Sequence, residues 1–381
     1  MKIGIDISQA AYKGSGVARY CTSLVESLVT YDSKNKYVFF YSSLRKKLDP
    51  SIRELIKKQH TLIEYRLPIS LLSFFWNTLH IFPIELFIGK VDIFMSSDWT
   101  EPPSKSAIKV TTIHDMVIYL YPETTTSSTT FNPFTLHISP NIVAQQKKKH
   151  KLVQKESSAV LADSQHTADD IQKHLQIDKK DIHLLYPAVT LPKKTTAWDG
   201  LKNTYNITTP FILSVGKLEP RKNIKSLISA FSESHLTNIE LLIVGDMGWG
   251  ENTDHNIPGV RYLGFVPDED LQTLYQHAEF FVFPSLYEGF GYPILEAMGN
   301  NCPVACSQSS SLSEIGNDAV LYFDPLHIHS ISKALITLNS NASLRKELQK
   351  KGKARFAEFS SQKFAHNFVR IVDTIYHDNR S

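Results

Sequence analysis

The chain has 381 residues, of which 42% are hydrophobic and 21% are charged, a balance typical of a globular protein with a large core. Its length exceeds what a single core commonly supports, so we expect two domains of under about 200 residues each. The formal net charge of +3 does not demand an anionic partner, and we expect no nucleic acid among the partners.

The first half of the chain alternates strand-like and helical patterns. Its N-terminus, MKIGIDIS, is already typical of a buried strand, so no signal peptide is indicated. Further strand-like runs lie at 37–43, 91–97, 108–115 and 159–164, and helical patterns lie at 17–29 and near 140–157. This alternation predicts a doubly wound α/β domain over residues 1–190.

The stretch GSGVARY, residues 14–20, contains a Gly-x-Gly formed by Gly14 and Gly16. It is a poor dinucleotide fingerprint, because Arg19 stands at the third glycine position. Two interpretations stay open: a bare turn before a helix, and a loop whose backbone N–H groups face a ligand.

Two stretches of the first half could concern a membrane. The most apolar window, residues 69–89, contains Asn77, His80, Pro83 and Glu85, which disfavours a spanning helix. Four apolar residues of this window fall at helical spacing: Leu72, Phe75, Trp76 and Leu79. Such spacing is more typical of a core than of a membrane surface. The Lys-rich run at 147–151 predicts a solvated helix face, with contact to an anionic membrane as the alternative.

His114 and Asp115 end the strand-like run at 108–115. A histidine at this place can hydrogen-bond a hydroxyl or ease proton movement near neutral pH. A core histidine that is satisfied by a backbone carbonyl is the alternative.

The second half repeats the alternation of strands and helices. Strand-like runs lie at 211–219, 239–246, 260–266, 279–285, 303–308 and 319–325, and the clearest helical patterns lie at 269–278 and 293–300. A second parallel sheet is therefore expected. The segment 187–210, rich in Thr, Pro and Lys, is the predicted linker, and the tail from about 326 predicts two or three amphipathic helices.

Ligands of open α/β sheets bind beyond the carboxyl ends of the strands, so the residues that follow strands are the candidate site. VGKLEPRKN, residues 215–223, follows the first strand of the second half. Arg221 offers a fork suited to phosphate oxygens, and Lys222 a compact point charge. The alternative is an exposed basic pair that opens the next helix.

YEGFGYPILEAMG, residues 287–299, places Glu288 in a strand-to-helix loop and Glu296 one turn into the helix, with Pro293 suited to its first turn. The glycines at 289 and 291 let backbone N–H groups approach an anion or ligand closely. Glu296 can accept two hydrogen bonds from a ribose diol. The alternative for Glu296 is a first-turn acid that complements the helix dipole.

No metal site is expected. Asp268-Glu269-Asp270 could suggest a divalent metal, but an N-cap with first-turn acids explains it more simply. The three cysteines, Cys21, Cys302 and Cys306, form no CxxC pair and predict buried reduced thiols of a cytosolic protein.

Taken together and in this order, the motifs resemble glycosyltransferase family four, a family of retaining sugar-nucleotide enzymes. The matching stretches are GSGVARY, IHD at 113–115, VGKLEPRKN, LGFVPDEDL at 263–271 and EGFGYPILE, the last of which matches the family's Glu-x7-Glu motif. The chain departs from the family at 95–97, where His-Ser-Pro is frequent, and at 187–188, where Asn-Gly is frequent. Both departures concern the acceptor and the hinge more than the donor motifs.

The resemblance implies an α/β protein of the GT-B fold, in which two doubly wound Rossmann-like domains face each other across a cleft. The acceptor-side domain would span 1–190 and the donor-binding domain 191–360, with a C-terminal helix at 361–381 that returns to the N-terminal domain.

The resemblance also implies roles for single residues. Arg221 and Lys222 would bind the donor diphosphate, and Glu296 the ribose hydroxyls. Glu288, Gly289, Phe290 and Gly291 would contact the transferred sugar, and Gly16 and Gly216 would line the donor site. His114 would contact the sugar or guide the acceptor hydroxyl, so the implied catalytic residues are His114, Glu288, Arg221 and Lys222.

The implied function is retaining transfer of a hexose from a sugar nucleotide to a glycan or lipid-linked acceptor, without a metal or another cofactor. On the resemblance we favour α-mannose from GDP-mannose, with UDP-glucose or UDP-N-acetylglucosamine as the alternative donor. A catalytically silent sugar-nucleotide-binding partner, an epimerase and a phosphorylase stay open. The expected location is the cytoplasm, with peripheral contact at the inner face of the membrane as an alternative.

Overall fold

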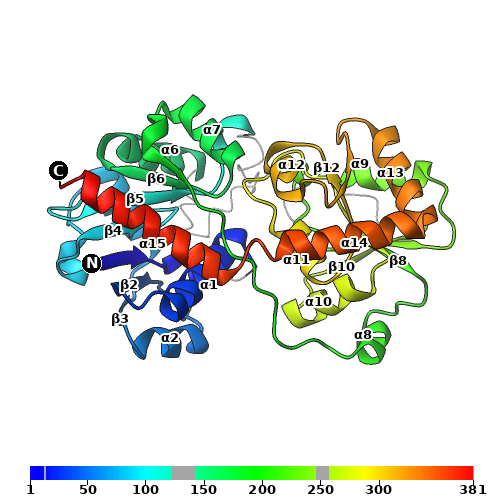
Figure 1. The fold of residues 1–381 in the computed structure, drawn as a ribbon, viewed down its shortest axis with the longest axis horizontal. Helices are drawn as coiled ribbons and strands as arrows, with labels where there is room; N and C mark the ends of the chain where they lie inside the picture. Colours follow the sequence, from blue (N-terminus) through cyan, green and yellow to red (C-terminus); the bar gives the residue numbers. More distant parts are fainter. Residues whose placement is uncertain (13, 122–141, 246–256, 381) are drawn as a thin grey trace, which may run out of the picture. The chain divides into compact units, whose positions relative to one another are not determined.

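The computed structural model describes residues 1–12, 14–121, 142–245 and 257–380, which form two compact units (Figure 1). Unit 1 comprises Met1–Ala188 and Phe359–Ser381, and unit 2 comprises Val189–Glu358. The sequence placed these boundaries after residues 190 and 360. Each unit has its own parallel sheet.

Unit 1 is built on a seven-stranded parallel sheet in the order β3-β2-β1-β4-β5-β6-β7. Its strands are β1 (Lys2–Asp6), β2 (Lys36–Ser42), β3 (Thr61–Tyr65), β4 (Ile93–Ser96), β5 (Ile108–Ile113), β6 (Ala159–Ala162) and β7 (Ile182–Leu184). The strand order reverses between β1 and β4, which is the place where doubly wound sheets bind ligands.

The helices of unit 1 cover both faces of its sheet. They are α1 (Gly16–Tyr31), α2 (Pro50–Lys57), α3 (Ile69–Ser73), the π-helix η2 (Phe74–Leu79), α4 (Glu85–Ile88), α5 (Val117–Leu120), α6 (Ile142–Glu156), α7 (Gln165–Leu175) and α15 (Ser361–Asp378), with short 3-10 turns at η1 (Ser8–Ala11) and η4 (Lys179–Asp181). Successive side chains of β2 lie on opposite faces of the sheet. Phe39 packs in the core that contains α1 and α15, whereas Phe40 packs with Trp76 of η2. Both faces are apolar for this reason, and the strands read as continuous hydrophobic runs.

Unit 2 is built on a six-stranded parallel sheet in the order β10-β9-β8-β11-β12-β13. Its strands are β8 (Phe211–Val215), β9 (Glu240–Val244), β10 (Val260–Gly264), β11 (Phe280–Phe283), β12 (Val304–Ser307) and β13 (Leu321–Phe323). Its helices are α8 (Trp198–Thr204), η5 (Pro220–Lys222), α9 (Ile224–Glu233), α10 (Asp268–His277), α11 (Tyr292–Gly299), α12 (Ser310–Gly316), α13 (Ile328–Ser340) and α14 (Ala342–Phe356). The structure thus confirms the predicted α/β class with two doubly wound sheets.

The predicted linker at 187–210 contains the boundary between the two units, and it also contains a helix. Residues from 189 onward belong to unit 2, and Trp198–Thr204 forms helix α8. Leu201 is buried, and Trp198 stacks on His277 of α10 with ring centroids 4.1 Å apart. These tertiary contacts stabilise the helix. Its own apolar periodicity is weak, so the sequence did not predict it.

Two further differences concern local burial in unit 1. In the apolar window, Leu72 and Trp76 are buried as predicted, but Leu79 is exposed. In the Lys-rich stretch, Lys149 and His150 are buried, so this face of α6 is only partly solvated. The short strands β3 and β7 carried too little pattern to be predicted. The ends of two predicted elements, residue 246 and residues 140–141, lie outside the described residues.

The tail forms the three helices α13, α14 and α15, at the upper limit of the prediction. Helix α15 contributes Phe364, Phe368 and Val372 to the core of unit 1. None of the described helices is both long and apolar enough to span a membrane.

Candidate functional site

The candidate site of unit 2 lies where its strand order reverses. Strands β8 and β11 are neighbours there, with Phe281 paired to Leu213. The loop after β8 carries Arg221 and Lys222, and the loop after β11 carries Glu288. The two loops are joined directly, because the backbone N–H of Leu286 donates to the carbonyl of Arg221 over 2.8 Å. Parallel topology therefore places residues 66 positions apart along the chain in one cluster.

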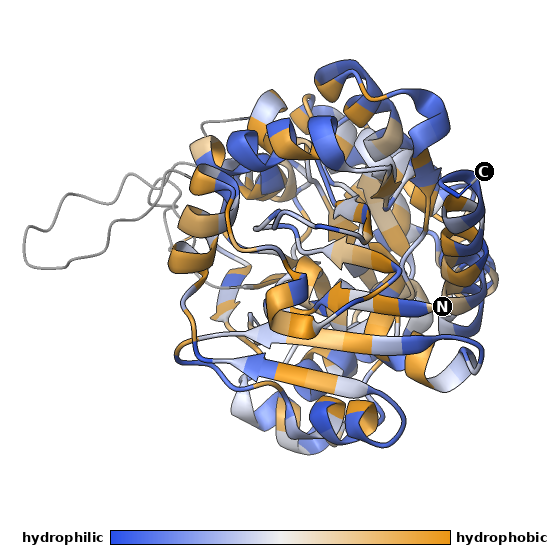
Figure 2. Cartoon of the chain, turned by 90° about the vertical axis from the view of Figure 1, so that its left-hand side faces the viewer, coloured by the Kyte–Doolittle hydropathy of each residue, from blue (hydrophilic) through white to orange (hydrophobic). Residues whose placement is uncertain are grey.

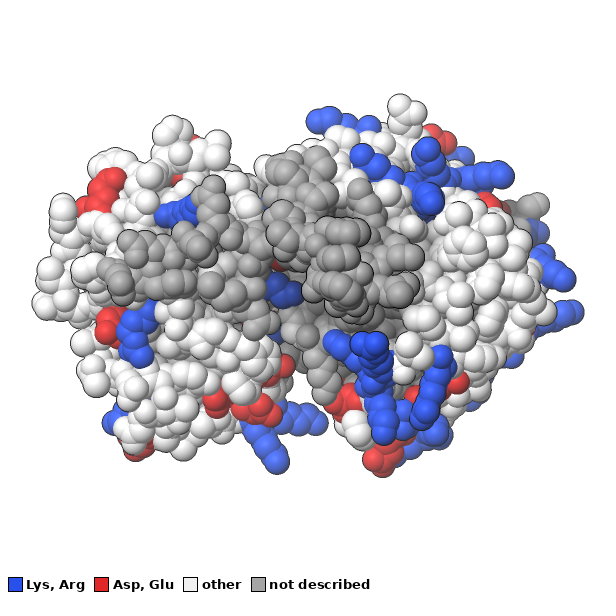
Figure 3. All heavy atoms as spheres, turned by 180° about the vertical axis from the view of Figure 1, so that it is seen from behind, with Lys and Arg blue, Asp and Glu red and all other residues white. Residues whose placement is uncertain are grey.

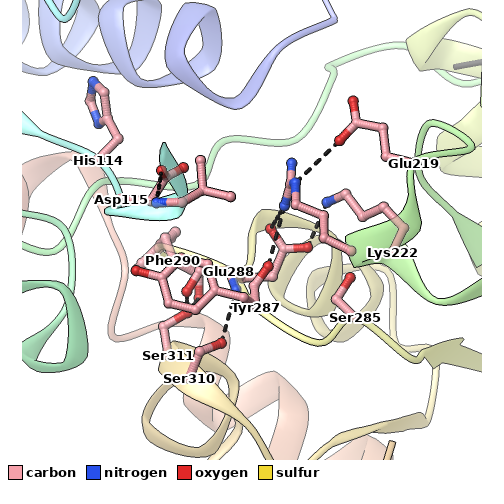
Figure 4. Close-up of polar contacts among 12 residues, drawn as sticks. His114, Asp115, Glu219, Lys222, Ser285, Tyr287, Glu288, Phe290, Ser310 and Ser311 are labelled. Atoms are coloured by element: carbon pink, nitrogen blue, oxygen red, sulfur yellow. Dashed lines mark hydrogen bonds and ion pairs between the residues drawn. The ribbon is translucent and has the colours of Figure 1, made fainter. Parts of the chain in front are cut away.

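Glu288 is the centre of this cluster (Figure 4). Its carboxylate accepts from Lys222 Nζ over 2.5 Å and from Arg221 Nη1 over 3.1 Å. Arg221 also donates from Nε to Glu219 over 3.1 Å and from Nη1 to the carbonyl of Tyr287 over 3.3 Å. The ammonium of Lys222 lies 5.2 Å from the centroid of the Phe283 ring. Each charged group is thereby held in one position.

The electrostatics of the cluster favour the charged form of Glu288. Burial by itself would raise the pKa of Glu288, but Lys222 and Arg221 lower it to about 2. Burial and the neighbouring guanidinium lower the pKa of Lys222, and Glu288 opposes that shift. The carboxylates of Glu219 and Glu288 balance the two cations in charge, and Arg221 and Lys222 are the kinds of donors that bind anionic ligands.

The backbone around Glu288 is fixed by two serines of helix α12 that the sequence motifs did not indicate. Ser310 Oγ accepts from the backbone N–H of Glu288 over 2.9 Å. Ser311 Oγ lies 2.8 Å from the carbonyl oxygens of both Glu288 and Phe290, to which it donates. The run SQSSSLSE directly after a strand is the signal that could have found them, since strand ends of one sheet share an edge.

Gly291 is required where it stands. Its φ is +116°, and a Cβ atom there would lie 2.9 Å from Cδ2 of Leu312. It is the N-cap of α11, and Pro293 occupies the first turn as predicted. Gly289 and Phe290 precede it in the same loop, and the Phe290 ring is buried and packs edge-on against Tyr292.

Gly216 lies beside the aliphatic stem of Lys222. A Cβ atom on Gly216 would lie 3.5 Å from Cδ of Lys222. The end of β9 also approaches it closely: a Cβ on Gly245 would meet the carbonyl oxygen of Gly216 at 2.2 Å. Only a glycine at 245 permits this contact between the two strand ends.

Glu296 lies in α11 and is buried, with 8% of its surface exposed. It lies five positions after the N-cap Gly291, and the first turn of α11 contains no acidic residue. The alternative of a first-turn acid that complements the dipole is therefore wrong, since that effect fades within the first turn.

In unit 1, His114 forms a buried pair with Asp163. Nδ1 of His114 lies 2.7 Å from Oδ2 of Asp163, and the Tyr20 ring packs edge-on against the imidazole at 4.7 Å. The two residues follow the neighbouring strands β5 and β6, whose register pairs Ile113 with Ala162. His114 is thus satisfied by a carboxylate, and the alternative of a carbonyl partner is wrong.

The pair has its own electrostatics. Burial by itself would lower the pKa of His114, but the charge of Asp163 raises that pKa above its ordinary value. Asp163 was missed as a site residue, although the sequence AVLADS places it directly after a strand. Gly16, the remaining predicted site residue, is exposed and begins α1, whose N-cap Ser15 accepts from the backbone N–H of Ala18 over 3.2 Å.

The structure therefore brings together Gly216, Arg221, Lys222 and Glu288 in unit 2, with Gly291 close along the chain. Gly16 and His114 lie in unit 1. Asp268-Glu269-Asp270 fills the first turn of α10, but the N-cap is Pro267, so the predicted N-cap role is wrong. Asp270 instead accepts from the hydroxyl of Tyr205 over 3.0 Å. In the part of the chain that the structure describes, no group of three or more His, Cys, Asp or Glu could hold a metal ion.

Two doubly wound units, each with polar residues at the carboxyl edge of its sheet, define the GT-B class of fold. Sucrose-phosphate synthase from Thermosynechococcus elongatus has this fold, with a TM-score of 0.72 over 99% of this chain and 100% of that chain at 16% sequence identity. Residues 202–355 match the family described as glycosyl transferases group 1. The match confirms the resemblance to glycosyltransferase family four that the motifs predicted.

Curated relatives agree with this family. O-antigen chain mannosyltransferase B of Escherichia coli is 38% identical over 188 residues, which cover 46% of this chain and 46% of the relative. The N-acetylgalactosamine-N,N'-diacetylbacillosaminyl-diphospho-undecaprenol 4-alpha-N-acetylgalactosaminyltransferase of Campylobacter jejuni is 26% identical over 257 residues, or 61% of this chain and 67% of the relative. The chain spans less than half the length of the first curated relatives that it matches.

Proposed function

We propose that this protein is a retaining hexosyltransferase that moves a hexose from a sugar nucleotide to a glycan or lipid-linked acceptor. The observation that carries the proposal is the cluster of half-buried Lys222 and Arg221 with buried Glu288, at the point where the strand order of unit 2 reverses. A site of this kind suits a diphosphate, because a fixed guanidinium and a fixed ammonium stand at the carboxyl end of a parallel strand, where α/β sheets bind ligands.

In the proposed reaction, the acceptor hydroxyl oxygen forms a bond to the anomeric carbon while the bond between that carbon and the diphosphate oxygen breaks. The electron pair of the broken bond stays on the nucleoside diphosphate, and a phosphate oxygen takes the hydroxyl proton. Lys222 and Arg221 stabilise the charge that grows on the diphosphate without having to reorganise. Because these two cations supply the stabilisation, we propose that the reaction needs no metal.

Glu288 has a second task in this proposal beside its contact with the sugar. It holds Lys222 and Arg221 in place before the donor arrives, so their positioning costs little when the donor binds. The buried Glu296 would accept hydrogen bonds from the ribose hydroxyls, and the backbone of Gly289, Phe290 and Gly291 would face the sugar. In unit 1, Gly16 would line the phosphate side of the donor, and His114 would contact the sugar or guide the acceptor hydroxyl.

For the transferred sugar we propose α-mannose from GDP-mannose. The similarity to an O-antigen mannosyltransferase supports this choice over a UDP-sugar. A lipid-linked acceptor is supported by the relative whose name contains diphospho-undecaprenol. Such an acceptor places the enzyme in the cytoplasm at the inner face of a membrane.

The first experiment is a thermal-shift panel of GDP, UDP, ADP and their sugars, measured with and without a chelator. A nucleotide that binds the folded protein raises the melting temperature by mass action. We expect GDP and GDP-mannose to give the largest increase, and we expect the chelator to leave it unchanged. A larger response to UDP would overturn the mannose assignment, and a response that the chelator removes would overturn metal independence.

A second measurement separates transfer from the other functions. Nucleoside diphosphate should be released from the donor only when an acceptor mannoside is present. Binding without release under any acceptor would instead identify a catalytically silent sugar-nucleotide-binding protein, and release without acceptor would identify a hydrolytic or epimerising activity.

A further inference from the structure

Unit 1 exposes an apolar surface on the segment from α3 to α4. We name it the apolar patch, and its residues are Leu71, Phe74, Leu79, Ile81, Phe82 and Leu86. Their exposed fractions run from 37% for Leu71 to 65% for Leu86. Within the described residues, this stretch of 16 positions holds six of the 13 large hydrophobic side chains that are exposed. Scattered exposed hydrophobic residues are ordinary, but such a concentration marks a binding surface.

The segment is firmly anchored, so its exposed side chains are not a consequence of loose packing. Trp76, Ile84 and Ile88 are buried in a core with Phe40 and Phe94 of the sheet. The indole N–H of Trp76 also donates to the carbonyl of Phe82 over 3.0 Å. The ribbon coloured by hydropathy shows hydrophobic positions on surface helices of the face in view as well as in the strands (Figure 2).

The backbone of this segment is held in uncommon conformations. Phe74–Leu79 forms the π-helix η2, and His80 after it has a left-handed φ of +52°. Phe82 has a φ of +63°, which is a genuine outlier for a bulky residue. Strained backbone of this kind persists at functional places, where the surroundings determine it. Here it turns Ile81 and Phe82 toward solvent.

A row of lysines on α6 borders the apolar patch. Three contacts run along the two segments: Ser73 Oγ donates to Gln145 Oε1 over 2.9 Å, Lys148 Nζ donates to Thr78 Oγ1 over 3.4 Å, and His80 Nε2 lies 2.8 Å from Glu156 Oε1. The exposed lysines of α6 are Lys147, Lys148, Lys151 and Lys155. Lysine and arginine side chains stand out from the face in view as separate groups (Figure 3). Of the lysines of α6, Lys148 contacts the segment itself, at Thr78, and the ammonium of Lys147 lies 5.4 Å from the centroid of the Tyr119 ring.

We propose that the apolar patch and the lysine row of α6 form a docking surface for an anionic phospholipid membrane. Phe, Leu and Ile side chains would enter the boundary between headgroups and acyl chains, and the lysines would remain at the level of the anionic headgroups. This charge complementarity favours a lipid surface over a second copy of the chain. The inference deepens the proposed function, because a lipid-linked acceptor lies at a membrane, but its test requires no transfer.

The test is cosedimentation of the full chain with vesicles, one set of phosphatidylcholine alone and one set that also contains phosphatidylglycerol. We expect binding to the anionic vesicles and much weaker binding to the neutral ones. Salt should weaken the binding, since the lysine contribution is screened. Absence of binding to anionic vesicles would overturn the proposal, whatever nucleotide the protein binds.

Two sets of variants locate the surface. Phe74→Gln, Leu79→Gln and Leu86→Gln together should weaken binding by at least about tenfold, because three exposed apolar side chains are lost from the interface. The control is Leu44→Gln, Leu326→Gln and Ile336→Gln, which alters three comparably exposed apolar residues elsewhere and should bind as the wild type does. Equal binding by both triple variants would overturn the assignment of the patch.

The lysine row is tested in the same way. Lys147→Gln, Lys148→Gln and Lys151→Gln should weaken binding by about fivefold for each lysine, whereas Lys346→Gln, Lys350→Gln and Lys353→Gln on α14 should not. Unchanged melting curves and nucleotide thermal shifts would show that both sets fold. Light scattering without vesicles tests for self-association of the chain. If the protein self-associates in a concentration-dependent way and the patch variant abolishes this, the occupant of the patch is a second copy of the chain and the proposal is wrong.

Discussion

The two units place charged pairs at equivalent positions but use different chemistry. In unit 2, Glu288 lies against Lys222 and Arg221, which lower the pKa of its carboxyl group to about 2. In unit 1, His114 lies against Asp163, and a histidine titrates near neutral pH. Both clusters stand at the carboxyl ends of parallel strands. The comparison teaches that the fold supplies the position, whereas the side chains decide between holding fixed charge and holding a proton.

The largest effect should come from the fixed charge. We expect Lys222→Ala to lower kcat of glycosyl transfer by about 10²-fold, because loss of one preorganised donor costs about 3 kcal/mol in the transition state. Steady-state kinetics with GDP-mannose and an acceptor mannoside measure it. Lys350→Ala, on the exposed surface of α14, is the control. A loss confined to KM would mean that Lys222 only binds the donor.

The second prediction concerns the stability that the unit 2 cluster contributes. The pKa of Glu288 is about 2 in the folded protein against an ordinary value of 4.5, which corresponds to about 3 kcal/mol. Because the folded pKa is lowered, this stabilisation is present above pH 4.5 and is lost as the pH falls toward 2. We therefore expect Glu288→Gln to lower the free energy of unfolding at pH 7 and to approach the wild type in acid.

Urea denaturation from neutral to acidic pH checks this expectation. Glu54→Gln, which alters an exposed ion pair within α2, should differ little from the wild type at every pH. A difference between Glu288→Gln and the wild type that does not change with pH would show that packing, and not charge, makes the contribution.

A smaller effect is expected at the ribose end. Glu296→Ala should weaken donor binding by about tenfold, since a hydrogen bond to a charged group contributes about 1.5–3 kcal/mol. Titration calorimetry with GDP-mannose measures the change in Kd. Glu296→Gln keeps one acceptor oxygen and should recover part of the affinity. Wild-type Kd in both variants would remove Glu296 from the donor site.

The smallest effect is a shift along the pH axis. Asp163 raises the pKa of His114, so Asp163→Asn should lower that pKa and move the limb of the kcat/KM profile that reports His114 to lower pH. The control Asp170→Asn removes a half-buried His–Asp pair within α7 and should leave the profile in place. An unmoved profile in Asp163→Asn would reduce the unit 1 pair to a structural contact.

Much of this site was predictable because strand ends are visible in a sequence. Buried parallel strands are uninterrupted apolar runs, and the polar residues that follow them, such as Arg221, Lys222 and Glu288, necessarily lie at one edge of a sheet. Asp163, Ser310 and Ser311 also follow strands, and that position is the one signal that their own stretches carry. Their importance comes from partners that are distant along the chain.

The sequence by itself determined the α/β class, the six strands of unit 2, the family resemblance and the residue types of the candidate site, because periodicity and short motifs are local properties. Only the tertiary structure decided that Glu288 holds two cations and that His114 faces a carboxylate. It alone also placed the lysines of α6 beside an exposed apolar patch. These facts depend on strand order and helix packing, which bring together residues far apart in the chain and thereby set burial, charge and exposure.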